Sequence, residues 1–268
     1  MHTGKLSVAA ALLCVALLLP AASRCETVWT YPLDADILAN RQGYLTLANK
    51  DCLLDADFEP FDLVQLTVKK TVNDMKLRKK AAEALTEMFL AAQDAGYTLW
   101  VKSAYRSYQT QKTMYYNRLN SMGRDDGLVQ YPGASDHQTG LGVDVLNYEW
   151  TKKDGMNAKF ANEPEAQWMA QHCWEYGFVI RYELDKEDIT GIKYEPWHLR
   201  YVGRETAAYM TQAHLCLEEF EAERLEAIRA YEQDGGDFTR LVMRLNLPRP
   251  ILILETNSDG EEEYSAFY

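Results

Sequence analysis

The chain has 268 residues, of which 47% are hydrophobic and 12% aromatic, so it can bury the core of one full-sized domain. It carries 28 Lys and Arg against 40 Asp and Glu, a formal net charge of -12. That charge repels phosphate backbones and anionic headgroups, which excludes nucleic acid as an expected partner.

The N-terminal segment has the composition of an export signal. Lys5 precedes a run over residues 6–19 that is apolar apart from Ser7, and residues 20–23 are small or Pro, as at a signal-peptidase site. An uncleaved anchor is the alternative, but the run is shorter than the roughly 20 residues that span a bilayer. We expect residues 1–23 to be removed, leaving a secreted protein with no stable membrane insertion.

Cysteine usage fits export, because four cysteines remain after residues 1–23 are removed. They are Cys25, Cys52, Cys173 and Cys216. An even number in an oxidising compartment allows two disulfides, and three pairings are possible. Pairing Cys25 with Cys52, and Cys173 with Cys216, keeps each pair within one region. Four free thiols are the alternative.

The first half of the chain predicts alternating strands and helices. Residues 44–47 resemble a strand, residues 75–95 an amphipathic helix that Gly96 ends, and residues 97–104 a second strand. Ser107 has the position of an N-cap for the next helix. The apolar residues predicted to share one face of the first helix are Leu77, Ala81, Leu85, Met88, Phe89 and Ala92.

A Gly- and Asp-rich connection then leads into a short strand. In residues 141–146 the odd-numbered side chains are uniformly apolar, whereas the even-numbered face carries Asp144. Pro164 fits the first turn of a further helix that ends near Gly177. This region therefore predicts a strand with a carboxylate on one face, followed by a covering helix.

The last third predicts two extended segments, a long helix and a tail. Residues 178–182 and 193–202 read as extended, and residues 204–233 as one acidic helix. Residues 251–254 form one convincing strand within a tail to which the sequence assigns no role.

Irregular mixing of strands and helices favours an α+β fold with a central antiparallel sheet and flanking helices. No repeat or low-complexity linker interrupts residues 40–230. We therefore expect a single catalytic-sized domain over residues 24–235 and a C-terminal tail over residues 236–268.

Two of the five histidines lie in surroundings that suit a metal. His137 is followed seven residues later by Asp144, across a Gly-rich turn and into the predicted strand, and His198 supplies a third candidate. Imidazole nitrogen and carboxylate oxygen are good zinc ligands, and a catalytic zinc site needs three protein ligands. His172 and His214 lie on predicted helices and are interpreted as structural.

Glu195 comes three residues before His198 and is a candidate base. Strict strand alternation would send the two side chains to opposite faces. Pro196 between them favours a local irregularity that turns both toward one point. Taken singly, each polar residue also has an ordinary structural explanation.

Three separated blocks together resemble the VanY-like zinc D-alanyl-D-alanine carboxypeptidase family, over roughly residues 40–220. The blocks are SAYRS at residues 103–107 with Gln111, SDHQTG at residues 135–140 with Asp144, and EPWH at residues 195–198. They occur in the family's order and spacing. Three agreeing blocks are specific where any one alone would be weak.

The resemblance implies the hedgehog/DD-peptidase fold with a zinc site on the sheet. It assigns the zinc ligands to His137, Asp144 and His198, and the general base to Glu195. It therefore also implies Zn²⁺ as the cofactor.

The same resemblance assigns the substrate-binding residues. Arg106 would stabilise charge on the substrate, and Gln111 and Ser135 would help to hold the terminal D-alanine. The chain departs from the family's usual pattern at Ala104, where Gly is common, and at Asp136, where Glu is common. Neither change is expected to disturb the chemistry.

The resemblance implies a bacterial, cell-wall-associated enzyme that hydrolyses the C-terminal D-alanine of peptidoglycan stem peptides. One alternative is an L,D-carboxypeptidase acting on tetrapeptide stems, because the motifs do not separate the two activities. Another is a non-catalytic wall-binding protein, suggested by the acidic helix and the tail. The intact ligands and base favour the enzyme.

Overall fold

The computed structural model describes residues 27–245, 251–256 and 262–267. The predicted signal peptide at residues 1–23 lies outside this part of the chain. The elements of the first half of the chain are α1 (Ala35–Leu38), β1 (Leu63–Gln65), β2 (Lys76–Arg78), α2 (Lys79–Asp94), β3 (Leu99–Ser103), α3 (Tyr108–Met122), the 3-10 helix η1 (Asp136–Thr139) and β4 (Gly142–Asn147).

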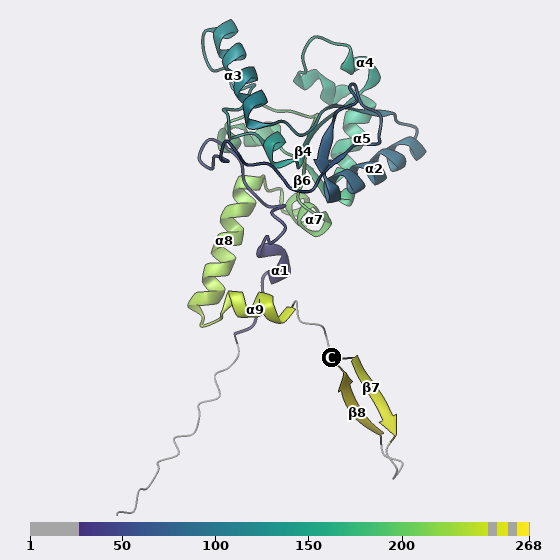
Figure 1. Cartoon of the computed structure of the whole chain (residues 1–268), viewed down its shortest axis with the longest axis vertical. Coiled ribbons are helices and arrows are strands. Elements are labelled where there is room, and N and C mark those ends of the chain that lie inside the picture. Colours follow the sequence, from purple (N-terminus) through teal and green to yellow (C-terminus); the bar gives the residue numbers. More distant parts are fainter. Residues whose placement is uncertain (1–26, 246–250, 257–261, 268) are drawn as a thin grey trace, which may run out of the picture.

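The remaining elements complete the sheet and add a helical extension (Figure 1). They are α4 (Tyr148–Thr151), η2 (Ala158–Asn162), α5 (Pro164–His172), η3 (Cys173–Tyr176), β5 (Phe178–Ile180), η4 (Leu184–Lys186), α6 (Glu187–Thr190), β6 (His198–Tyr201), α7 (Arg204–Ala213), α8 (Leu217–Gln233), α9 (Phe238–Leu245), β7 (Ile251–Thr256) and β8 (Glu262–Phe267).

A four-stranded antiparallel sheet of order β3-β4-β6-β5 forms the centre of the fold. The predicted α+β class with an antiparallel sheet is confirmed. β4 and β6 are the two inner strands, so a side chain on either one is supported by neighbouring strands on both sides. This is the most rigid position that the sheet offers for a functional group.

The main core lies between this sheet and the helices α2 and α5. Val143 and Val145 of β4 are fully buried with Leu85 and Met88 of α2 and Met169 of α5. Because side chains alternate along a strand, Asp144 points to the opposite face of the sheet. Packing of the helices thus fixes which face is left for polar residues.

A second apolar cluster joins the N-terminal segment to the helical extension. Leu33 and Leu38 pack with Leu217 and Phe220 of α8, and α8 leads away from the sheet toward α9 (Figure 1). The helix α9 falls within the predicted tail. No helix in the described ranges is long and apolar enough to cross a membrane.

Several predicted boundaries are confirmed. Ser107 caps α3, its hydroxyl accepting a hydrogen bond from the Thr110 amide at 3.3 Å, and Pro164 occupies the first turn of α5. The helix predicted over residues 75–95 begins later, because Leu77 belongs to β2, which pairs with β1. Leu77 is nevertheless buried in the predicted core.

The strand predicted over residues 44–47 is wrong, because this segment is a turn and an irregular stretch. Its carbonyls do not bind a neighbouring strand. Instead, the Tyr44 and Thr46 carbonyl oxygens accept hydrogen bonds from Nη2 of Arg200 at 3.0 and 2.6 Å. A buried guanidinium has taken the place of a strand partner.

The single long helix predicted over residues 204–233 is also wrong. It is divided into α7 and α8 at His214, whose φ of 53° is left-handed. Glu219 accepts a hydrogen bond from the Cys216 amide at 2.9 Å and so caps the new helix. The break lets α8 leave the sheet in a new direction.

The predicted disulfide between Cys173 and Cys216 is wrong, because both thiols are free and buried. Cys173 packs in the main core, whereas Cys216 lies at the N-cap of α8. Cys52 is free and exposed, and Cys25, its predicted partner, lies outside the described residues.

Candidate metal centre

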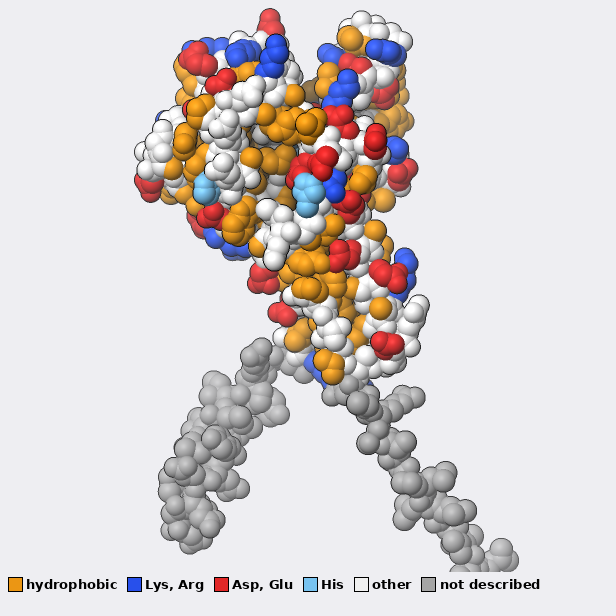
Figure 2. All heavy atoms as spheres, turned by 180° about the vertical axis from the view of Figure 1, so that it is seen from behind, with side chains coloured by type: hydrophobic (Ala, Val, Ile, Leu, Met, Phe, Trp, Pro, Cys, Tyr) orange, Lys and Arg blue, Asp and Glu red, His pale blue; other side chains and the backbone are white. Residues whose placement is uncertain are grey.

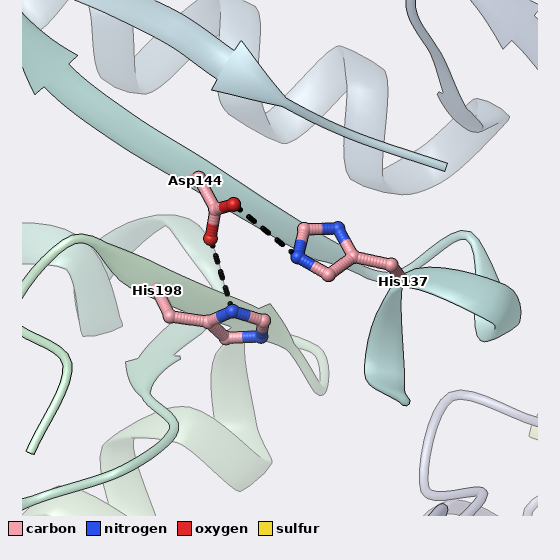
Figure 3. A group of neighbouring side chains, drawn as sticks. All are labelled: His137, Asp144 and His198. Atoms are coloured by element: carbon pink, nitrogen blue, oxygen red, sulfur yellow. Dashed lines mark ion pairs between the residues drawn. The ribbon is translucent and has the colours of Figure 1, made fainter. Parts of the chain in front are cut away.

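His137, Asp144 and His198 converge on one point at the sheet (Figure 3). One possible ligand atom from each residue lies within 4.8 Å of the other two. The Nε2 atom of His137 is 3.3 Å from Asp144 Oδ2, and the Nδ1 atom of His198 is 3.0 Å from Asp144 Oδ1. At most 5% of any of these side chains is exposed.

The pairing of the inner strands brings two of the three side chains together. Asp144 on β4 lies directly opposite His198 on β6 in the antiparallel register. Directly opposed residues of an antiparallel pair have Cβ atoms about 4.5–5.5 Å apart. On the other side of β4, a register shift between Val101 and Ser103 sets Ser103 opposite Asp144.

His137 reaches the same point from the short helix η1, which packs closely on β4. A Cβ atom at Gly142 would lie 3.0 Å from the Asp136 backbone, so glycine permits this approach. Gly140 ends η1 with a φ of 67°, a conformation that glycine adopts readily. The Nδ1 atom of His137 lies 2.7 Å from the Ala104 carbonyl oxygen, which orients Nε2 toward Asp144.

Glu195 completes the group through the predicted irregularity at Pro196. The amide of His198 donates a hydrogen bond to the Glu195 carbonyl at 3.0 Å, which closes a turn around Pro196. Both side chains therefore face the same point, and Glu195 Oε2 lies 3.5 Å from His198 Nδ1. Only 8% of Glu195 is exposed.

The ionisable side chains of this site differ in their pKa values. Burial raises the pKa of Glu195 to about 8, and it lowers the pKa of His137 to about 4 with help from Arg106. Burial also opposes ionisation of Asp144, but the two imidazoles outweigh it and hold its pKa below the usual range. The site therefore combines a neutral imidazole, an ionised carboxylate and a carboxyl group that exchanges its proton near neutral pH.

The donor set fits a divalent transition metal such as zinc. Two imidazole nitrogens and one carboxylate oxygen make a common catalytic zinc set with room for further ligands. Within the part of the chain that the structure describes, Asp144 Oδ1 is buried and has no assigned hydrogen-bond partner, although His198 Nδ1 lies 3.0 Å away. A buried carboxylate oxygen without a hydrogen bond is costly unless a cation binds it.

A cavity of about 140 Å³ opens beside the three side chains. Figure 2 shows the surface hollowed between the part that carries α3 and the part that carries α4. Besides the ligand candidates, the cavity is lined by three predicted site residues, Arg106, Gln111 and Ser135, and by Glu195. The structure thus brings all seven predicted site residues to one place.

Arg106 and Gln111 are linked to each other. Nη1 of Arg106 donates to the Gln111 side-chain oxygen at 2.8 Å, and Nη2 donates to Ser103 Oγ at 3.3 Å. The Gln111 amide nitrogen donates to the Gln130 carbonyl at 2.6 Å. Both polar ends of Gln111 are therefore occupied, which makes it a support for Arg106 and for the cavity wall.

Sequence reasoning missed the residues behind the metal centre. Asp136 is bound by the guanidinium groups of Arg181 and Arg200, and all three are fully buried. Tyr182 packs on the ring of His198, with ring centroids 5.0 Å apart. The only available signal was the motif position of Asp136, because no local pattern links it to residues so far along the chain.

The two histidines interpreted as structural lie away from this cavity. His172 contacts Glu175 at 2.8 Å. His214 forms a second, mostly exposed group of possible ligands with Glu183 and Asp185. Its Nε2 atom lies 2.7 Å from Asp185 Oδ2, so an exposed ion pair accounts for the arrangement.

The sequence profile of a family described as VanY, D-alanyl-D-alanine carboxypeptidase, matches residues 74–204. The protein YodJ of Bacillus subtilis (strain 168) is 38% identical over 193 residues, covering 69% of each chain. VanXYC of Enterococcus gallinarum, named a bifunctional D-Ala-D-Ala dipeptidase and carboxypeptidase, is 31% identical over 189 residues. That match covers 70% of this chain and 98% of the relative.

The chain is also similar to solved structures of carboxypeptidases. The LD-carboxypeptidase LdcB has 39% sequence identity and a TM-score of 0.61, covering 68% of this chain and 85% of LdcB. A vancomycin-resistance D,D-pentapeptidase VanY, solved in complex with Zn(II), has 29% identity and a TM-score of 0.54. It matches over 66% of this chain and 98% of the VanY chain.

Proposed function

The chain belongs to the family of VanY-type D-alanyl-D-alanine carboxypeptidases, and we propose that it removes the C-terminal D-alanine from peptidoglycan stem peptides with zinc held by His137, Asp144 and His198. The observation that carries this proposal is the convergence of three ligand atoms within 4.8 Å, with Glu195 beside them. A non-catalytic wall-binding protein would not need this set.

Zinc supplies Lewis-acid chemistry at this site when it is bound, polarising the scissile carbonyl and lowering the pKa of water to about 7. Glu195 is the proton carrier. Its carboxylate lines the cavity beside the ligand candidates, where its ionised form would accept a proton from the attacking water and pass it to the departing amine. Such a positioned acid and base contributes about 10²–10⁴ in rate.

Arg106 binds the substrate. Its guanidinium lines the cavity that holds the ligand candidates, and Gln111 and Ser103 fix its orientation. A positive charge at this position attracts the carboxylate end of a peptide and stabilises the negative charge that develops on the attacked carbonyl oxygen. Ser135 is buried in the same cavity wall and helps to hold the terminal D-alanine.

The substrate places the enzyme outside the cytoplasmic membrane of a bacterium, associated with the cell wall. Export through the apolar leader at residues 6–19 and its removal would produce this location. The excess of acidic residues favours a peptide substrate over nucleic acid. A chain that stays in the membrane fraction after salt washing with residues 1–23 still attached would contradict removal of the leader.

An L,D-carboxypeptidase is the second candidate function. The structural similarity to LdcB, an LD-carboxypeptidase, at 39% identity favours it. It would use the same metal, base and arginine on a tetrapeptide stem. The two candidates differ in the residue that precedes the scissile bond, which has the D configuration for the first and the L configuration for the second.

One experiment separates the candidates. Purified mature protein is incubated with pentapeptide and tetrapeptide muropeptides, with and without a chelator, and the products are identified by mass. Loss of one D-alanine from the pentapeptide supports the main proposal, whereas loss from the tetrapeptide alone supports the second. Cleavage of neither by zinc-loaded protein, or equal cleavage with chelator present, would refute both.

A further inference from the structure

Asp136 is a fully buried carboxylate to which the proposed reaction assigns no role. It accepts a hydrogen bond from Arg181 Nε at 2.8 Å and another from Arg200 Nη1. Burying one carboxylate with two guanidinium groups is costly unless the geometry is well satisfied. We call Asp136, Arg181 and Arg200 the cage, and we expect it to have a role beyond neutralising charge.

One oxygen of Asp136 is turned toward His198. The Nδ1 atom of His198 faces Asp144, and its other nitrogen, Nε2, is buried without a hydrogen-bond partner in the described residues. The Oδ2 atom of Asp136 lies 3.9 Å from Nε2. Tyr182 packs on the imidazole ring and restricts its movement.

The second ligand histidine already has an outer partner. Nδ1 of His137 lies 2.7 Å from the Ala104 carbonyl oxygen, so its proton is held there and Nε2 is free for a metal. Ligand histidines in metal sites almost always donate their outer N–H to a carbonyl or a carboxylate. Asp136 is the group placed to do this for His198.

We infer that Asp136 is a positioning residue, which attracts the Nε2 proton of His198 and so leaves the Nδ1 lone pair for the metal. This inference rests on the proposed zinc site. The separation of 3.9 Å exceeds a hydrogen bond by about 1 Å, so the inference requires His198 Nε2 and Asp136 Oδ2 to approach each other when the metal binds. Arg181 and Arg200 hold the carboxylate in place beside the ring.

The cage is built partly from segments outside the residues that match the family profile, 74–204. Arg181 binds both carboxylate oxygens of Glu218 on α8, each at 2.7 Å. Arg200 donates to the carbonyls of Tyr44 and Thr46. The helix α8 and the N-terminal segment thus help to hold the two arginines in place.

Zinc affinity tests the inference with a matched pair of variants. Asp136→Asn removes the negative charge that faces His198. Glu218→Gln removes the negative charge of the other carboxylate bound to Arg181 and leaves the Asp136 carboxylate unaltered. Both variants should lose stability. By competition with a chromogenic chelator, Asp136→Asn should bind zinc about 10–100-fold more weakly than wild type, and Glu218→Gln should stay close to wild type. Equal affinity in Asp136→Asn and wild type would overturn the inference.

A spectroscopic measurement on the wild type keeps the test independent of how the variants fold. In zinc-loaded protein labelled with ¹⁵N-histidine, the Nε2 proton of His198 should be shifted downfield and exchange slowly, as expected for a proton held by a carboxylate. A fast-exchanging Nε2 proton without that shift would overturn the inference. Wild type that binds no zinc would refute the metal site itself, so the two failures are distinguishable.

Discussion

Asp144 and His198 are directly opposite each other on β4 and β6, the two inner strands of the sheet. This register places two of the three candidate metal ligands on the inner strands of the sheet, while His137 reaches them from η1. A shift of one residue would turn every side chain of β6 to the other face, which would send His198 into the core and Leu199 into the cavity. The pairing that stabilises the fold is therefore the same pairing that assembles the site.

Loss of a ligand should remove the metal. His137→Ala leaves Asp144 and His198, and two protein ligands rarely hold zinc well. We expect substoichiometric zinc by metal analysis of the purified variant. His172→Ala is the matched control, because this histidine lies on α5, contacts Glu175 and Trp168, and does not line the cavity. Full zinc in His137→Ala would remove that residue from the ligand set.

Loss of the base should separate metal binding from turnover. Glu195→Gln keeps the shape of the side chain but cannot accept a proton, so kcat should fall about 10²–10⁴-fold while zinc remains bound. The exposed Glu232→Gln on α8 should be unaffected. Wild-type kcat in Glu195→Gln would assign proton transfer to another group.

Loss of the arginine should affect the substrate and not the metal. Arg106→Ala removes the charge that faces the developing oxyanion, so turnover should fall about 10²–10³-fold with normal zinc content. Gln111→Ala should give a smaller loss, because it only frees the Arg106 side chain. The exposed Arg229→Ala on α8 is the control. Unchanged kinetics in Arg106→Ala would place the substrate-binding role elsewhere.

The ion pair between α8 and Arg181 should make stability depend on pH. Burial alone would raise the pKa of Glu218, but hydrogen bonds and attraction from Arg181 outweigh it and hold the pKa below its ordinary value. A lowered folded-state pKa adds stability above the unfolded value of about 4.3, and this contribution is lost as the pH falls through the folded value.

Denaturant unfolding of wild type and Glu218→Gln at several pH values measures this contribution. Wild type should be the more stable of the two at pH 7, and the difference should shrink as the solution is acidified. A difference that is constant across this range would show that ionisation of Glu218 does not support the fold.

Much of the site was accessible from the sequence because its residues lie in short blocks. The turn at Pro196 and the cap at Ser107 are local features, and each follows from the residues beside it. The alternation around Asp144 correctly indicated which face of the strand is polar. Local patterns of this kind can be predicted without knowledge of the fold.

The errors arise where contacts between distant segments decide the outcome. Residues 44–47 have strand-like composition, but Arg200 binds their carbonyls. The helix break at His214 occurs in a stretch without Gly or Pro, so no strong local signal marks it, and packing of α7 and α8 sets where the chain turns. Asp136 lies 45 and 64 residues from Arg181 and Arg200 in the chain, and no local sequence pattern links them. These ion pairs can therefore be identified only from the structure.

Anomalous diffraction at the zinc absorption edge, from crystals of the protein grown without added metal, tests the central claim most directly. We predict one strong peak about 2.0–2.2 Å from His137 Nε2, an Asp144 carboxylate oxygen and His198 Nδ1. A fully occupied peak elsewhere, with none between these three side chains, would contradict the account.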